Sequence, residues 1–92
     1  MELKTAFGMA LRQIRLAKGL AQEDLMKAEI SQSYLSQLEQ GVRGASLAQT
    51  EKLASAMGVH PLMLLAKCYA IKGSEDASGL LHQIAVDLEE IG

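Results

Sequence analysis

The sequence predicts an all-α protein with one main domain, and three observations support this. Residues that favour helices, chiefly alanine, leucine, glutamine, glutamate, lysine and methionine, dominate the chain, and proline occurs once. Hydrophobic residues make up 49% of the 92 residues, which excludes a wholly disordered chain. In several segments apolar side chains recur every three or four residues, as they do along one face of an amphipathic helix.

A first helix is predicted near the N-terminus, with Thr5 as its N-cap and Lys18 near its end. Phe7, Leu11 and Ile14 recur at spacings of four and three residues, so they would form one stripe that faces the core.

The stretch from residue 22 to residue 41 predicts a short second helix, a tight turn and a third helix. Ser31 is suited to cap the third helix, because its hydroxyl can accept a hydrogen bond from a free backbone N–H. Leu35 and Leu38 lie three residues apart and would face the core. The opposite stripe has hydrogen-bonding groups and no charge; it consists of Gln32, Ser33, Ser36, Gln37 and Gln40.

That uncharged stripe suggests a surface that reads DNA, because solvated helix faces usually carry lysine and glutamate. Glutamine can bond the N6 and N7 edge of adenine in two places, and serine can donate or accept. We therefore expect base contacts in a major groove from Gln32, Ser33 and Gln37, with Ser36 next. The alternative is a polar face that serves solubility alone.

Two further helices follow a glycine-containing loop. Ser46 is expected to cap the fourth helix, whose apolar stripe includes Leu53 and Met57. Pro61 is suited to the first position of the fifth helix, and His60 would take the N-cap place before it. Residues 1–72 would thus form the main domain.

Residues 73–92 are expected to form an acidic linker and a C-terminal helix. The linker would span residues 72–78, and Ser78 would cap a helix that runs to about Ile91. The apolar stripe of this helix needs cover; it consists of Leu80, Leu81, Ile84, Leu88 and Ile91. The stripe could fold back on the first and fifth helices or pair with a second copy, and we favour a part in a dimer interface.

The net charge of −2 is unevenly distributed along the chain. Residues 73–92 contain five acidic residues and no lysine or arginine, whereas residues 1–72 contain nine basic residues against six acidic ones. Phosphate contacts supply much of the affinity of a DNA-binding protein, so this mildly basic front part predicts modest non-specific binding and a dependence on dimerisation.

Nothing in the sequence predicts catalysis, a metal site or a cofactor. A zinc site needs four ligands at short spacings, and His60 and Cys68 have no further candidate ligands close to them in the sequence. A single cysteine cannot form an internal disulfide, which fits a reducing cytoplasm. No apolar run approaches the roughly 20 residues of a membrane span, and the N-terminus does not read as a signal peptide.

The order of these features resembles the Cro/C1, or Xre-type, family of phage-repressor-like helix-turn-helix regulators. The resemblance covers roughly residues 8–66. Its matching residues are Leu11, Arg12, Arg15, Gly19, Leu20, Gln22 to Leu25, Ile30, Ser31, Ser33 to Gly41, Leu47, Leu53, Ala54, Met57 to Val59 and Pro61 to Leu65. It implies a repressor-like domain of five helices, to which this chain adds a C-terminal helix.

The resemblance also implies roles for individual residues. Gln22 and Arg43 would contact DNA phosphates, and an ion pair between Arg15 and Glu39 would link the first and third helices. Tyr34 would either pad the first helix or reach a phosphate or a thymine methyl group.

The chain departs from the family pattern in the turn between the second and third helices. The family usually has one more residue there, and a glycine; Glu29 stands near that glycine's place. We expect either a tighter turn or a second helix that ends one residue early.

Together these features predict a sequence-specific transcriptional regulator, more readily a repressor than an activator. It would bind double-stranded DNA as a homodimer on a palindromic operator. The alternative is a protein-interaction module, such as an antitoxin-like adaptor, whose last helix binds a protein partner.

Overall fold

The computed structural model describes residues 1–26 and 29–92, and every regular element within these ranges is a helix. In chain order the helices are α1 (Leu3–Ala17), α2 (Gln22–Leu25), α3 (Gln32–Glu39), α4 (Leu47–Met57), α5 (Pro61–Gly73) and α6 (Ala77–Ile91). The predicted all-α fold, five helices with an additional C-terminal helix, is confirmed.

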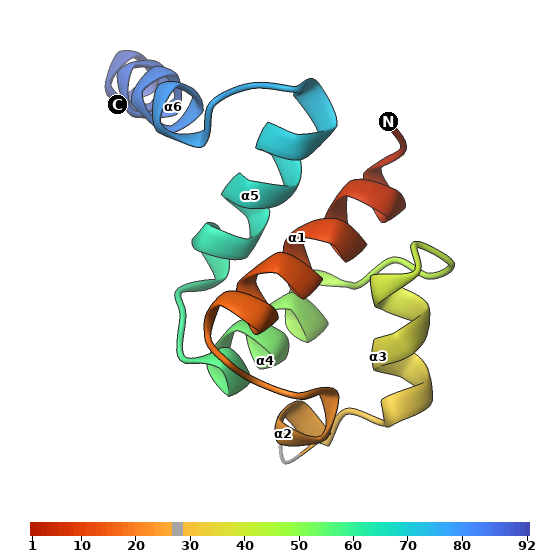
Figure 1. The fold of residues 1–92 in the computed structure, drawn as a ribbon. Helices are drawn as coiled ribbons and strands as arrows, with labels where there is room; N and C mark the ends of the chain where they lie inside the picture. The colour runs from red at the N-terminus through yellow and green to blue at the C-terminus, as the bar shows by residue number, and fades with distance from the viewer. Residues whose placement is uncertain (27–28) are drawn as a thin grey trace.

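Helix α1 lies at the centre of the domain and packs against α5 on one side and α3 on the other (Figure 1). Helix α4 packs against α5 and α2. The predicted stripe of Phe7, Leu11 and Ile14 is buried, and so are Leu35 and Leu38 of α3. One continuous core therefore holds α3 against the rest of the domain.

Gly8 lets α1 and α3 approach each other closely. A Cβ atom on Gly8 would overlap the carbonyl oxygen of Leu38 and lie 2.9 Å from that of Glu39. Glycine inside a helix usually lowers its stability, so this position needs glycine for packing and not for helix formation.

Two helix starts and one boundary differ from the expectations. Helix α1 begins at Leu3, and the N–H of Ala6 donates to the carbonyl of Glu2 (3.0 Å), so Thr5 lies inside the helix and is not its cap. Helix α6 is capped by Asp76 instead of Ser78, because the Asp76 carboxylate accepts from the N–H of Gly79 (3.2 Å). Helix α5 extends through Gly73, so the linker before α6 is shorter than expected.

Other predicted caps are present. The hydroxyl of Ser31 accepts from the N–H of Tyr34 (3.1 Å), and that of Ser46 accepts from the N–H of Gln49 (3.1 Å). His60 caps α5, since its Nδ1 accepts from the N–H of Leu62 (3.0 Å).

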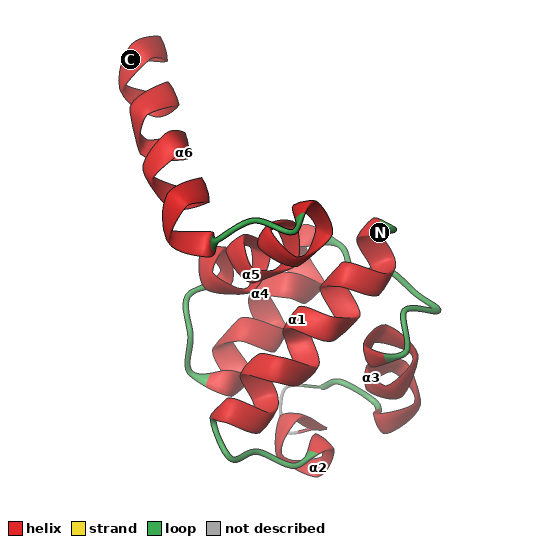
Figure 2. Cartoon of the chain, turned by 45° about the horizontal axis from the view of Figure 1, so that its top comes forward, coloured by secondary structure: helices red, strands yellow, loops and turns green. Residues whose placement is uncertain are grey.

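Helix α6 projects from the body of the domain (Figure 2). The longest dimension of the molecule is 41 Å, against 24 and 23 Å across it. Helix α6 packs chiefly against α5, and none of residues 77–91 is buried. The apolar stripe of this helix therefore has not folded back over α1.

No single helix among the described residues is long and apolar enough to cross a membrane. Helices α4 and α5 meet the length and composition only when taken together, across a bend of 108°.

The Gly8 contact predicts that Gly8→Ala destabilises the domain by about 1–3 kcal/mol, because the added methyl group must push α3 away from α1. Urea unfolding followed by circular dichroism measures this loss. Gly79→Ala is the matched control, because the nearest heavy atom to a Cβ there is 4.0 Å away. The control should show no loss, and a Gly8→Ala variant as stable as the wild type would contradict the close packing.

Candidate nucleic-acid interface

Helix α3 presents its polar residues on the side away from the core. Gln32 and Ser33 are exposed at its N-terminal end, while Ser36 and Gln37 are half-buried further along. The carbonyl of Gln37 accepts from the N–H groups of Val42 and Arg43 (3.0 and 3.4 Å), which holds the following loop against the end of α3.

The expected ion pair between α1 and α3 is present. Arg15 Nε donates to Glu39 Oε2 (2.7 Å), and Arg15 Nη2 donates to Glu39 Oε1 (2.9 Å), so the guanidinium holds the carboxylate with two bonds. The third nitrogen, Nη1, donates to the carbonyl of Leu20 (2.8 Å). The two side chains are only 8% and 5% exposed.

Glu39 also stabilises the charged form of Arg15. The hydrogen bond with Glu39 raises the pKa of the Arg15 guanidinium above its ordinary value, while burial acts in the opposite direction. The guanidinium therefore stays charged throughout the pH range in which proteins bind DNA. A buried pair of this kind contributes more to a fixed geometry than to net stability.

Gln22 extends this network from α2 to α3. Its Nε2 donates to Glu39 Oε1 (3.2 Å), and its Oε1 accepts from the hydroxyl of Ser36 (3.1 Å). The network therefore ties α1, α2 and α3 together through four side chains. Ser36 lies at the seam between α2 and α3, where its hydroxyl proton is already used.

Helix α2 begins without a capping side chain, because Ala21 occupies the N-cap position. Asp24 compensates: its Oδ2 accepts from the N–H of Ala21 (2.8 Å). This bond satisfies one free donor and keeps one carboxylate of the first turn occupied with the protein's own backbone.

The turn before α3 contains a backbone conformation that favours glycine. Glu29 has φ 64°, in the left-handed region. Helix α2 ends at Leu25, which makes it a single turn. Residues 27 and 28, in the same connection, lie outside the described residues.

The loop after α3 brings a cation over an aromatic ring. The guanidinium carbon of Arg43 lies 5.3 Å from the centre of the Tyr34 ring, and Nη1 makes a long contact of 3.5 Å with Gln37 Oε1. Tyr34 is half-buried and packs against the core, so its ring is held in place to make a cation–π contact with Arg43.

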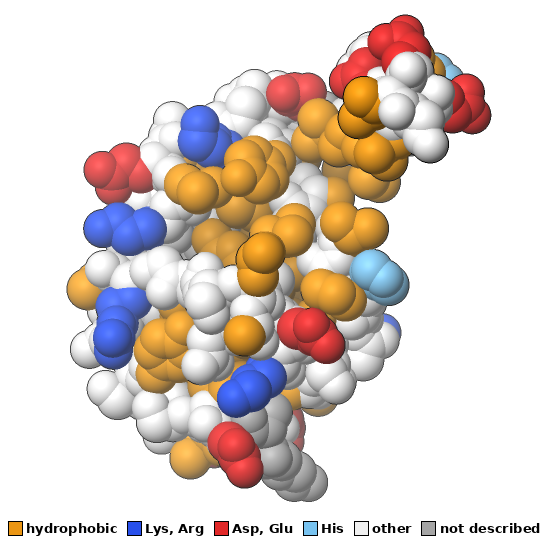
Figure 3. Space-filling view, turned by 180° about the vertical axis from the view of Figure 1, so that it is seen from behind, with side chains coloured by type: hydrophobic (Ala, Val, Ile, Leu, Met, Phe, Trp, Pro, Cys, Tyr) orange, Lys and Arg blue, Asp and Glu red, His pale blue; other side chains and the backbone are white. Residues whose placement is uncertain are grey.

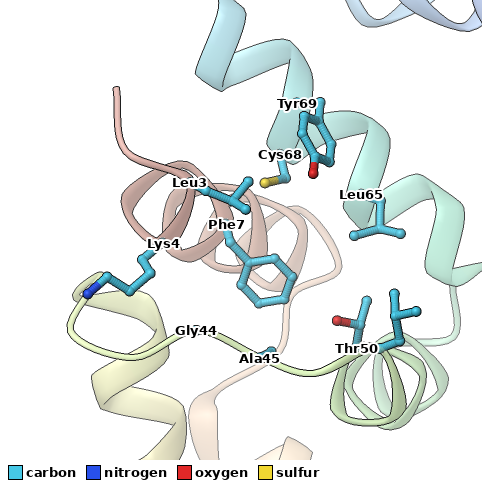
Figure 4. A pocket seen from close by; sticks show the side chains of 10 residues that line it. Leu3, Lys4, Phe7, Gly44, Ala45, Thr50, Leu65, Cys68 and Tyr69 are labelled. Carbon is cyan, nitrogen blue, oxygen red and sulfur yellow. The ribbon is translucent and has the colours of Figure 1, made fainter.

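A hollow of about 230 Å³ lies behind this loop, between α1, α4 and α5 (Figure 4). Phe7, Leu65 and Cys68 line it, and Lys4 extends beside Gly44 at its edge. Burial raises the pKa of the Cys68 thiol, whereas Lys72 lowers it by a smaller amount. Burial thus disfavours the reactive thiolate, and Cys68 behaves as a core residue.

The predicted site residues lie on α2, α3 and the loop after α3, except Arg15, which lies on α1. The sequence did not reveal the bonds of Gln22 to Ser36 and Glu39, nor the stacking of Arg43 on Tyr34. It also did not reveal Lys4 beside the loop, since nothing in the spacing of the N-terminal residues brings them to Gly44.

A helix-turn-helix family model matches residues 11–64 of the chain. The control protein C.BamHI of Bacillus amyloliquefaciens is 40% identical over 65 residues, which cover 68% of this chain and 80% of that protein.

Two solved structures are similar in fold and sequence. The restriction-modification controller protein C.AhdI of Aeromonas hydrophila has a TM-score of 0.63 and 40% identity, covering 66% of this chain and 94% of that one. The clp gene regulator ClgR of C. glutamicum has a TM-score of 0.72 and 30% identity, covering 76% and 92%.

The chain belongs to the Cro/C1-type helix-turn-helix family. It is a DNA-binding transcription regulator and not an enzyme. In this family α2 and α3 form the helix-turn-helix, and α3 is the helix that faces DNA.

The buried ion pair predicts a large effect of Arg15→Met. The substitution leaves the Glu39 carboxylate without a cation and the Leu20 carbonyl without a donor, so we expect a loss of about 3–5 kcal/mol in unfolding free energy. Urea unfolding measures it. Arg12→Met, at an exposed position on the same helix, should change stability by less than about 0.5 kcal/mol. Equal effects of the two substitutions would argue against the pair as a structural link.

The left-handed turn residue predicts that Glu29→Gly stabilises the protein by about 0.5–1 kcal/mol, because glycine adopts positive φ without a steric cost. Thermal unfolding is the measurement. Glu29→Ala removes the same charge but keeps the Cβ atom, so it should bring no comparable gain. If alanine stabilises as much as glycine, the cause is charge and not backbone conformation.

Proposed function

We propose that the protein is a homodimeric repressor that reads a palindromic operator with α3. The observation that supports this most directly is the uncharged polar end of α3, where Gln32 and Ser33 are exposed. Side chains in that state are available to base edges in a major groove.

Base contacts are assigned to Gln32, Ser33 and Gln37, with a smaller part for Ser36. Gln37 can exchange its long contact with Arg43 for a bidentate bond to adenine. Ser36 can accept from a base but would have to release Gln22 in order to donate, so its contribution is expected to be weaker.

Phosphate contacts are assigned to Gln22, Tyr34 and Arg43. The amide nitrogen of Gln22 carries two hydrogens, and the bond to Glu39 uses one, so one remains for a phosphate oxygen. Arg43 is exposed, and Tyr34 supports it at the end of α3. We add Lys4 to this set, because it extends beside the same loop.

Two copies are needed for useful affinity. A single helix of eight residues offers few base contacts, and the part of the chain before the acidic C-terminal segment has only a small excess of basic residues. A two-fold dimer doubles both the number of base contacts and the number of basic residues available to DNA. It places the half-sites about 34 Å apart, one turn of the DNA helix. Repression is favoured because occupation of a promoter needs no further domain.

We also place the protein in the cytoplasm. Its partner is DNA, and its single cysteine is a buried thiol, which suits a reducing compartment.

If α3 contacts bases, Gln32→Ala should weaken binding to the preferred duplex by about 5–150-fold. This corresponds to the loss of one bidentate base contact of about 1–3 kcal/mol. Gln37→Ala should act similarly, and both should leave binding to an unrelated duplex nearly unchanged. Fluorescence anisotropy on labelled duplexes measures this. Gln13→Ala, at an exposed position on α1, is the control and should have no effect. Unchanged affinity in both α3 variants would show that α3 does not read bases.

A further inference from the structure

We propose that α6 of one copy packs into the groove between α5 and α6 of a second copy. This inference rests on the proposed homodimer and specifies the surface that forms it. Four large side chains along one face of α6 remain exposed by 41–81%; they are Leu81, Ile84, Leu88 and Ile91. Monomeric proteins rarely leave such a face uncovered.

The groove that would receive this face is formed by α5 and α6 themselves. It has a volume of about 550 Å³ and is largely apolar; its lining includes Leu62, Leu65 and Tyr69 of α5 and Leu81, Ile84 and Leu88 of α6. Seen from behind, hydrophobic side chains extend from the body of the domain to the base of α6 (Figure 3). The exposed face and the groove are therefore parts of one apolar surface.

Symmetry identifies the second copy as the occupant. A helix and a groove that carry the same kind of surface on one chain can pair reciprocally across a two-fold axis, so that each copy gives and receives one helix. The result is a bundle of four helices, two from each copy. A helix of 15 residues with no buried residue is marginal by itself, and this arrangement supplies the cover it lacks.

Charge favours an antiparallel arrangement of the two α6 helices. Helix α6 has no lysine or arginine, and Asp87, Glu89 and Glu90 lie near its C-terminal end. A parallel pair would place these acids together. An antiparallel pair separates them.

The test compares Leu88→Glu with Val86→Glu by sedimentation velocity over a range of concentrations. Both variants add one negative charge at an exposed position of α6, but the two positions lie about 200° apart around the helix. We expect the wild type and Val86→Glu to dimerise equally, and the dissociation constant of Leu88→Glu to rise by at least about tenfold. Ile84→Glu, one turn away on the same face, should repeat the effect.

A duplex with one half-site separates this result from a loss of folding. Leu88→Glu should bind it as the wild type does, because α6 packs chiefly on α5 and not on α3. Two results would overturn the inference and leave the proposed homodimer standing. One is that dimers persist in both Leu88→Glu and Ile84→Glu. The other is that Val86→Glu raises the dissociation constant as much as Leu88→Glu does. A wild type that stays monomeric in every condition would overturn both, and would point to a different protein on this surface.

Discussion

The ion pair between Arg15 and Glu39 is the interaction on which the position of the DNA-facing helix depends. Its two bonds connect α1 to the end of α3, and a third bond from Arg15 to the carbonyl of Leu20 adds the chain just before α2. Gln22 of α2 donates to the same carboxylate and accepts a bond from the hydroxyl of Ser36 in α3. A rigid helix orientation matters for this function, because base contacts are lost when their donors move by a fraction of an ångström.

The ion pair alone would not place α3, since hydrophobic contacts fix how closely the helix approaches. Leu35 and Leu38 are completely buried, and Gly8 allows the backbone of α1 to touch the carbonyl groups at the end of α3. The polar network sets the angle and the apolar contacts set the distance. The outward face of α3 is then free to carry residues chosen for recognition and not for stability.

Much of the fold was predictable because it depends on periodicity and on caps. The buried stripes of α1 and α3 follow from their spacing, and Ser31, Ser46 and His60 cap the helices expected of them. The errors fall at the helix ends, where several residues could serve as a cap. Asp76 takes the place expected for Ser78 because its carboxylate reaches a backbone N–H three residues on.

Less of the site was predictable, because it depends on contacts between segments distant in the sequence. The pairing of Arg15 with Glu39 came from the family pattern, since 24 residues separate them and no local rule connects them. The stacking of Arg43 on Tyr34 and the approach of Lys4 to the loop depend on how the loop folds back. The positive φ of Glu29 could be anticipated only from the family pattern, which usually has a glycine near this position.

Selection from a randomised duplex pool tests the central claim most directly, namely that α3 reads bases as one of a symmetric pair. The purified protein is allowed to bind, and the retained duplexes are sequenced. The account predicts an inverted repeat whose half-sites have a fixed spacing of about one turn of DNA. Absence of any enriched sequence at low salt, where protein–DNA binding is strongest, would contradict it.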